Sequence, residues 1–289
     1  MILHGWRQIL DLLFPRACLL CRRLVVDERS PALCFHCEQD LSAIVKSCLR
    51  CGAPVRTNEL LISSPSKRTD CAFCKGQRWE FGRAWSYTVY QATAARAVRL
   101  MKEAHCESLT RSVGDLLANW LKTQEAFSSV NYDCIVPIPQ HWLRRLSQRY
   151  NHAATLGERL ALGLDLPCSD TILRRVGWTQ KQGMKTISER RENLLGAFEA
   201  PKPESVRYRS FLLVDDVMTS GATLQEAAIA LRKAGARHVD AVVFARGVNA
   251  SKPAGTQERA RKSEDPLTFD QNTREPQPPT NWELGRRIH

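Results

Sequence analysis

Apolar residues in the middle of the chain form two kinds of run. Short continuous runs such as "FLLV" at 211–214 are typical of strands buried on both faces of a sheet, whereas apolar positions every three or four residues indicate helices. The pattern predicts strands at 84–90, 132–139, 211–216 and 239–246, and helices at 92–103, 109–122, 151–164 and 222–235. Because strand and helix alternate, we expect an α/β domain over residues 81–249, with a mostly parallel sheet flanked by helices.

The segments on either side of this domain have different patterns. Residues 1–80 contain few long apolar periods but eight of the chain's eleven cysteines, so we expect a small domain that needs metal ions to fold. Residues 250–289 hold five prolines and many charges of both signs, which is typical of a disordered tail. The apolar start of the chain is interrupted by Arg7 and Asp11, and no stretch approaches the ~20 apolar residues that span a bilayer. We therefore expect a short amphipathic N-terminal helix, no membrane span and a cytoplasmic location.

The eight N-terminal cysteines form four C-x-x-C pairs, which are Cys18/Cys21, Cys34/Cys37, Cys48/Cys51 and Cys71/Cys74. Two-residue spacing directs both thiolates at one tetrahedral ion, so the four pairs predict two structural Zn²⁺ sites of four thiolates each. The spacing does not say which pairs share an ion. A disulfide framework is disfavoured because no secretory segment precedes the pairs, and a redox C-x-x-C normally occurs once, at the start of a helix.

Two adjacent acids, Asp215 and Asp216, end the buried run at 211–214, and a small turn at 217–223 then leads into the next helix. Ligands of open parallel sheets bind at the carboxyl ends of the strands. In the turn, Gly221 permits a close approach to the backbone, and the N–H groups of a helix N-terminus can bind a phosphate. The acids would repel a phosphate, so we expect them to accept hydrogen bonds from vicinal sugar hydroxyls or to hold Mg²⁺ through water.

A simpler interpretation is that one acid caps the helix and the hydroxyl residues only fill a turn. The coincidence of a buried run, two acids, a T-S-G-A-T turn and an amphipathic helix instead favours a sugar 5-phosphate ligand. Two common nucleotide-binding motifs are absent, because the chain has neither G-x-x-x-x-G-K-[ST] nor G-x-G-x-x-G after a strand.

The segment "VDDVMTSGATL" at 214–224 resembles the phosphoribosyl pyrophosphate (PRPP) binding loop of type I phosphoribosyltransferases. With the cysteine pairs, "LLFPRACLLC" at 12–21, "CLRCGAP" at 48–54, "RLMK" at 99–102 and "RRENLLGAF" at 190–198, the chain resembles the ComF family of competence proteins over residues 10–248. This resemblance implies a double zinc ribbon followed by a type I phosphoribosyltransferase fold, with PRPP and Mg²⁺ as ligands. It further implies a pentosyl glycosyltransferase that releases pyrophosphate, and a link to DNA uptake and natural competence.

The resemblance also implies roles for particular residues. Asp215 and Asp216 would contact the ribose hydroxyls as the main catalytic groups, and the 5-phosphate would be held by Met218, Thr219, Ser220, Gly221, Ala222 and Thr223. The pyrophosphate side of PRPP would be held by Pro137, Ile138, Pro139, Arg144, Arg145 and Lys102. The segment 174–191 would be the mobile loop that closes over PRPP, with Lys181 and Gln182 as further catalytic candidates. His152 stands where the family usually has Gln.

The net charge of +12 suits a polyanionic partner, either a phosphorylated metabolite or nucleic acid. Between residues 139 and 191, ten Lys and Arg residues face four acids, as binding of a pyrophosphate leaving group requires. Residues 1–80 carry twelve Lys and Arg residues against eight acids. An alternative function is therefore a factor that binds single-stranded DNA or DNA-processing proteins and uses the PRPP site as a sensor or scaffold without turnover. The zinc ribbons serve equally well as protein-contact modules, and the sequence does not reveal the acceptor or the oligomeric state.

Overall fold

The computed structural model describes residues 16–25, 32–44, 46–55, 71–140, 150–176 and 194–248. The chain divides into two compact units, residues 1–253 and 254–289, and the second unit lies outside the described residues. The tail expected from residue 250 and the amphipathic helix expected at the N-terminus also lie outside them. Within the described parts of the chain, no helix combines the length and the apolar character needed to cross a membrane.

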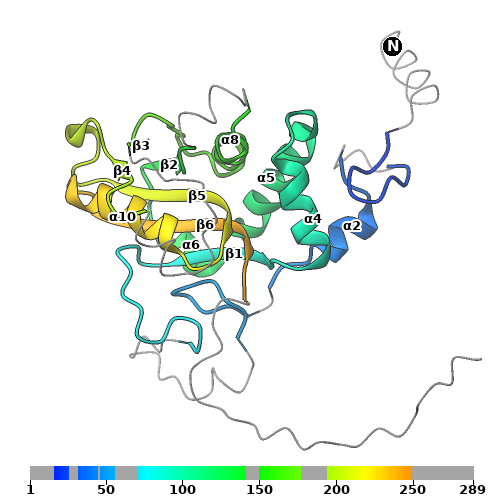
Figure 1. Ribbon diagram of the computed structural model, residues 1–289, viewed down its shortest axis with the longest axis horizontal. Coiled ribbons are helices and arrows are strands. Elements are labelled where there is room, and N and C mark those ends of the chain that lie inside the picture. Colours follow the sequence, from blue (N-terminus) through cyan, green and yellow to red (C-terminus); the bar gives the residue numbers. More distant parts are fainter. Residues whose placement is uncertain are drawn as a thin grey trace, which may run out of the picture. The chain divides into compact units, whose positions relative to one another are not determined.

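The first unit is built around four strands and the helices that cover them (Figure 1). The strands are β1 (Ala84–Val89), β2 (Cys134–Pro137), β5 (Ser210–Met218) and β6 (His238–Arg246), and a separate pair is formed by β3 (Arg174–Arg175) and β4 (Phe198–Glu199). The α-helices are α2 (Phe35–Asp40), α4 (Ala92–Met101), α5 (Glu107–Lys122), α6 (Glu125–Ser128), α8 (His152–Leu164) and α10 (Ala222–Lys233). Two short 3₁₀ helices, η1 (Ala104–Cys106) and η2 (Pro203–Ser205), complete the set of described elements.

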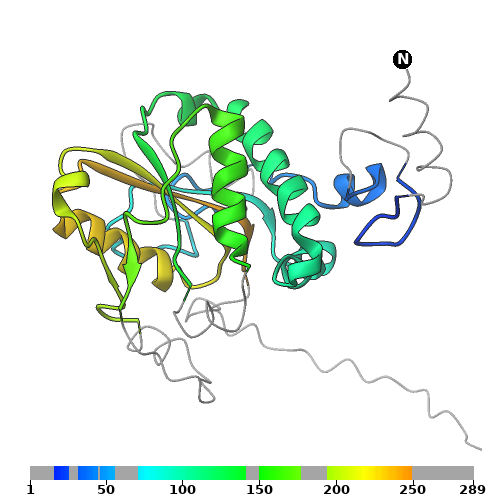
Figure 2. The ribbon, with the colours of Figure 1, turned by 90° about the horizontal axis from the view of Figure 1, so that it is seen from above.

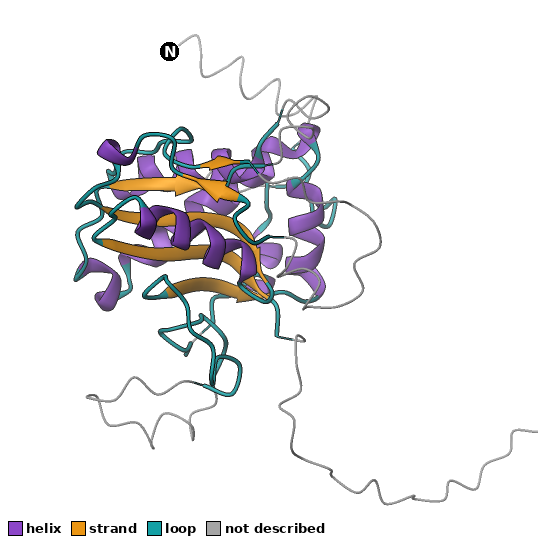
Figure 3. Ribbon diagram, turned by 60° about the vertical axis from the view of Figure 1, so that its left-hand side comes forward, coloured by secondary structure: helices purple, strands orange, loops and turns teal. Residues whose placement is uncertain are grey.

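The main sheet has the order β1-β6-β5-β2, and every neighbouring pair of its strands is parallel. Helices α4, α5 and α8 pack on one face and α10 packs on the other (Figures 2 and 3). Side chains of β5 alternate between these faces, with Leu212 and Val214 on the α5 side and Phe211 and Leu213 on the α10 side. The α/β domain with a parallel sheet flanked by helices is therefore confirmed.

Strand β5 is longer than its apolar run suggests. It continues through both acids to Met218, because β6 runs beside it and pairs with it as far as Met218 and Arg246. Asp215 and Asp216 therefore lie within the paired part of β5 rather than after its end. A carboxylate oxygen of each acid lies within 4.8 Å of the other and of a ring nitrogen of His152.

The two zinc-ribbon segments repeat one local structure. In each, the carbonyl of the first cysteine accepts a backbone hydrogen bond four residues later, from Arg22 N to Cys18 O and from Gly52 N to Cys48 O, both at 2.8 Å. Arg22 and Gly52 also have left-handed backbones, with φ of 66° and 67°. The same tight turn thus positions the first C-x-x-C pair of each ribbon.

Candidate functional site

The carboxyl ends of β2 and β5 lie at the same edge of the sheet because the two strands are parallel neighbours. Beyond β2, the backbone N–H of Ile138 donates to the carbonyl oxygen of Val214 at 2.9 Å, which keeps the proline-rich segment against β5. Lys102 follows the last residue of α4, and His152 is the first residue of α8. Both side chains reach Asp216 on β5, so segments that are distant in the sequence meet there.

Asp216 is the centre of this polar cluster. Its carboxylate is buried, with the residue 6% exposed, and its Oδ2 lies 2.9 Å from Lys102 Nζ and 3.4 Å from His152 Nε2. On the other side of the imidazole, the amide nitrogen of Gln140 lies 3.0 Å from His152 Nδ1 and donates to it, so Nε2 carries the proton that faces Asp216. Neither the Lys102 contact nor the His152 contact has hydrogen-bond geometry, and Oδ2 therefore keeps the capacity to accept a hydrogen bond from a ligand.

The two adjacent carboxyl groups have pKa values shifted in opposite directions. Burial acts to raise the pKa of Asp216, but His152 and Lys102 outweigh it and hold that pKa below the usual range. Burial and the neighbouring carboxylate raise the pKa of Asp215 well above its ordinary value, although its Oδ1 accepts from the backbone N–H of Asp216 at 2.9 Å. One acid is thus a fixed anion at neutral pH and its neighbour holds a proton more readily, an arrangement that is enriched at functional sites.

The turn after β5 brings backbone donors to the same edge. Gly221 has a φ of 78°, and a Cβ added there would lie 2.7 Å from Met218 Cε, so the turn requires glycine. Ser220 Oγ accepts from the backbone N–H of Ala222 at 3.4 Å, at the start of α10. The first N–H groups of a helix have no partner within the helix, and together with the hydroxyls of Thr219 and Ser220 they can bind an anion.

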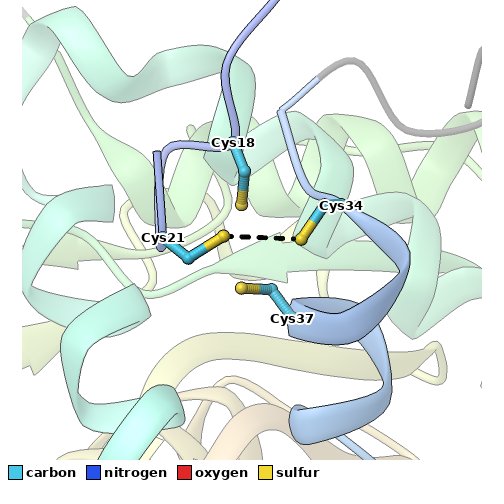
Figure 4. A group of neighbouring side chains, drawn as sticks. All are labelled: Cys18, Cys21, Cys34 and Cys37. Atoms are coloured by element: carbon cyan, nitrogen blue, oxygen red, sulfur yellow. Dashed lines mark hydrogen bonds between the residues drawn. The ribbon is translucent and has the colours of Figure 1, made fainter. Parts of the chain in front are cut away.

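Two groups of four cysteines meet the geometric requirement of a structural zinc site. Cys18, Cys21, Cys34 and Cys37 form one group, and Cys48, Cys51, Cys71 and Cys74 form the other, each with all sulfur atoms within 4.8 Å of one another. The sulfur atoms of the first group converge on one centre (Figure 4), with Cys21 and Cys34 3.5 Å apart. A tetrahedral ion with Zn–S of ~2.3 Å separates its sulfurs by ~3.8 Å, whereas a disulfide needs ~2.05 Å. The expected zinc sites are confirmed, and consecutive C-x-x-C pairs share an ion.

Several expected site residues lie outside the described residues. They are Arg144 and Arg145 after the proline segment, and Lys181 and Gln182 in the segment expected to close over the ligand. The described part of that segment, residues 174–176, contains β3, which pairs antiparallel with β4 after the segment. An ion pair between Arg174 and Glu199 joins these two strands.

Sequence reasoning missed two residues at this edge of the sheet. The sequence marks His152 as a replacement for the family's usual Gln and as a possible acid or base, but it does not indicate the pair with Asp216. Arg246, at the end of β6, donates to the carbonyl oxygens of Met218 and Thr219 in the turn, and its guanidinium is buried. A charged residue at the end of the apolar run "VDAVVFAR" was the available indication.

Comparison with known families assigns both halves of this architecture. Residues 9–75 match the double zinc ribbon domain and residues 151–275 match the phosphoribosyl transferase domain. Competence protein F of Haemophilus influenzae is 36% identical over 115 residues, which is 39% of this chain and half of that relative's length. Together these matches support a ComF-family protein. DNA utilization protein YhgH of Salmonella typhimurium is 26% identical over 227 residues, which is 78% of this chain and 94% of that relative's length.

Solved structures with partial similarity to this chain include phosphoribosyltransferases. Glutamine PRPP amidotransferase from B. subtilis has 14% identity over 51% of this chain and 30% of its own, with a TM-score of 0.35. Adenine phosphoribosyltransferase from Saccharomyces cerevisiae has 18% identity over 52% of this chain and 72% of its own, with a TM-score of 0.30. These TM-scores are too low to support an argument. The assignment of the type I fold therefore rests on the match to the phosphoribosyl transferase domain and on the parallel strand order.

Proposed function

We propose that this ComF-family protein binds Mg-PRPP at the carboxyl edge of the sheet and transfers its ribosyl 5-phosphate to an acceptor with release of pyrophosphate. Asp215 and Asp216 accept hydrogen bonds from the ribose hydroxyls. The turn from Met218 to Thr223 and the N-terminus of α10 bind the 5-phosphate. Pro137, Ile138 and Pro139, with Lys102 beside them, hold the pyrophosphate.

The observation that carries this proposal is the state of Asp216. It is a buried carboxylate that Lys102 and His152 keep ionised, and its Oδ2 can still accept a hydrogen bond. Three residues further along the chain begins the turn whose backbone and hydroxyl groups can bind a phosphate. A hydroxyl acceptor and a phosphate site at this separation fit the two ends of a ribose 5-phosphate.

The residues present fit Mg²⁺ that is held through water. Asp215, Asp216 and His152 offer ligand atoms within 4.8 Å of one another. Mg²⁺ prefers oxygen ligands and keeps several waters, so the two carboxylates suit it, while the imidazole is occupied by Asp216 and Gln140. Bound with PRPP, Mg²⁺ would neutralise charge on the pyrophosphate oxygens.

The transfer breaks the bond between ribose C1 and the pyrophosphate oxygen and forms a bond from C1 to the acceptor. Positive charge develops on the ribose while negative charge develops on the leaving group. The contribution of the chain is to fix the ribose and the phosphate, and to place cations near the departing oxygens. Lys102 is a described cation beside the acids, and Arg144, Arg145, Lys181 and Gln182 would complete the pyrophosphate side and its closure.

Calorimetric titration with Mg-PRPP tests the site. Asp216→Asn and Asp215→Asn each weaken hydrogen bonds to the ribose, and the affinity should fall by about 10- to 100-fold. Asp165→Asn is a matched control, because this exposed residue has a left-handed backbone that asparagine adopts equally well, at the far end of α8. Equal affinities for all four proteins would contradict the proposed roles of the acids.

The names of the relatives, a competence protein and a DNA utilization protein, favour a second function that involves DNA. We propose single-stranded DNA as the partner in that case, with PRPP binding as a sensor without turnover. The net charge of +12 fits that partner. Affinity for an unstructured oligonucleotide should then fall steeply with salt. Pyrophosphate release in the presence of candidate acceptors separates the two, because a sensor binds PRPP and releases none.

A further inference from the structure

The guanidinium of Arg246 joins the second zinc ribbon to the phosphate turn. It is 3% exposed, and its Nε donates to the carbonyl oxygen of Cys51 at 3.0 Å. Its Nη1 donates to the carbonyl oxygens of Met218 at 2.8 Å and Thr219. Arg246, which lies 195 positions after Cys51 in the sequence, therefore ties this zinc-ligand residue to the first residues of the turn.

The charge of Arg246 matters as well as its hydrogen bonds. Only carbonyl oxygens accept from it among the described residues, and no described carboxylate pairs with it. Burial of a cation without a carboxylate partner is costly, and a nearby anion reduces that cost. Because the guanidinium contacts the carbonyl oxygens of Met218 and Thr219, its positive charge would stabilise an anion bound by the turn.

Further contacts fix the second ribbon against the same part of the domain. A Cβ added at Gly52 would lie 2.1 Å from Ser86 Oγ, so the ribbon backbone lies directly against β1. The backbone N–H of Glu80 donates to Gln225 Oε1 of α10 at 2.9 Å, and the Trp79 ring lies against Gly221. The ribbon thus touches the turn, the helix that follows it and the edge strand.

The first ribbon packs elsewhere. Its buried residues Cys18, Cys37 and Leu41 share a hydrophobic cluster with α4 and α5. Those of the second ribbon share a different cluster with Met218 and α10. The two zinc sites therefore have different neighbours although their local turns are alike.

We propose that the second zinc ribbon positions the turn that binds the 5-phosphate. This inference rests on the proposed function. Zinc bound by Cys48, Cys51, Cys71 and Cys74 fixes the Cys51 carbonyl, and Arg246 transmits that position to the 218–223 turn as a positioning residue. The turn then has the shape and the positive potential that receive the 5-phosphate. The first ribbon has no such role in ligand binding.

Calorimetry with ribose 5-phosphate and with pyrophosphate tests the proposal, because the two probes report on opposite ends of the site. Arg246→Lys keeps the charge but loses the planar fork, so it should lower affinity for ribose 5-phosphate by about tenfold and change that for pyrophosphate by less than about twofold. Both zinc ions and the circular dichroism spectrum should be retained. Equal losses for both probes, or no loss, would overturn the role of Arg246.

The two zinc sites provide matched variants. The double substitution Cys48→Ser with Cys51→Ser should weaken ribose 5-phosphate binding, whereas Cys18→Ser with Cys21→Ser should leave it unchanged. Adding Arg246→Lys to the Cys48/Cys51 variant should give little further loss, because both changes act through one connection. Equal effects of the two ribbon variants would overturn the proposal.

Hydrogen exchange in the wild-type protein needs no variant to fold. Ribose 5-phosphate should slow amide exchange in residues 218–223 and also in residues 46–55 and 71–80, but not in residues 16–25 and 32–44. Protection confined to 218–223 would overturn the link to the second ribbon. Failure of the wild-type protein to bind either PRPP or ribose 5-phosphate would instead refute the proposed function.

Discussion

Gly221→Ala, compared with a control, tests whether the shape of the 218–223 turn determines PRPP binding independently of the stability of the domain. Gly221 has a φ of 78°, and a left-handed backbone costs a non-glycine residue about 1–2 kcal/mol. The added Cβ would also lie 2.7 Å from Met218 Cε, so the Met218 side chain must move. Because Met218 Cε is the end of a flexible side chain, the larger disturbance is the backbone strain at Gly221, where α10 begins.

Gly235→Ala is the matched control, since Gly235 follows the other end of α10 with a φ of 94°. A Cβ there would lie 3.4 Å from Arg207 Cγ, far from the turn. We expect both variants to lose about 1–2 kcal/mol, a decrease in Tm of roughly 2–8 °C for a protein of this size.

Only Gly221→Ala should weaken Mg-PRPP binding, by about tenfold or more, because only this change reshapes the backbone that would hold the 5-phosphate. Differential scanning calorimetry and isothermal titration measure the two quantities on the same samples. Unchanged PRPP affinity in Gly221→Ala, or an equal loss in Gly235→Ala, would refute the assignment of the turn.

Three further predictions concern an ion pair at the site, an ion pair between two helices and the zinc content. Lys102→Met removes a cation that lowers the pKa of Asp216. Ionised Asp216 stabilises the fold above its ordinary pKa, and this stabilisation is lost as the pH falls, so acid unfolding of the variant, followed by circular dichroism, should begin at a higher pH than in wild type. An unchanged midpoint would count against the Lys102–Asp216 pair. Arg159→Met breaks the ion pair with Asp115 between α8 and α5, and should cost about 0.5–1 kcal/mol in chemical denaturation while leaving PRPP affinity unchanged. Elemental analysis should find about two zinc ions per chain, a value that Cys134→Ser leaves unchanged; one ion or none would contradict two four-thiolate sites.

Local patterns were sufficient to predict the four strands of the main sheet and helices α4, α5, α8 and α10, but not α6, β3 or β4. The apolar run before Asp215 gave the position of β5, and the periodicity after Gly221 gave α10. The end of β5 was not predictable in this way, because it depends on pairing with β6 as far as Arg246. Hydrogen bonds between strands that are far apart in sequence extend a strand beyond its apolar residues.

In the candidate site, too, features local in the sequence were predictable and contacts between distant segments were not. Asp216 and the turn were recognisable because acids, small residues and a helix start are adjacent in the chain. The contact of Asp216 with Lys102 and the bond from Arg246 to the Cys51 carbonyl each join distant segments, and single residues give no local indication of them. The choice of cysteine pairs that share a zinc ion is also a property of the folded chain.

Titration of the wild-type protein with PRPP in the presence and absence of Mg²⁺ tests the central claim most directly. The site described here predicts saturable binding of one PRPP per chain that strengthens with Mg²⁺ and is competed by ribose 5-phosphate. No detectable binding heat at millimolar Mg-PRPP, with both zinc ions in place, would contradict it.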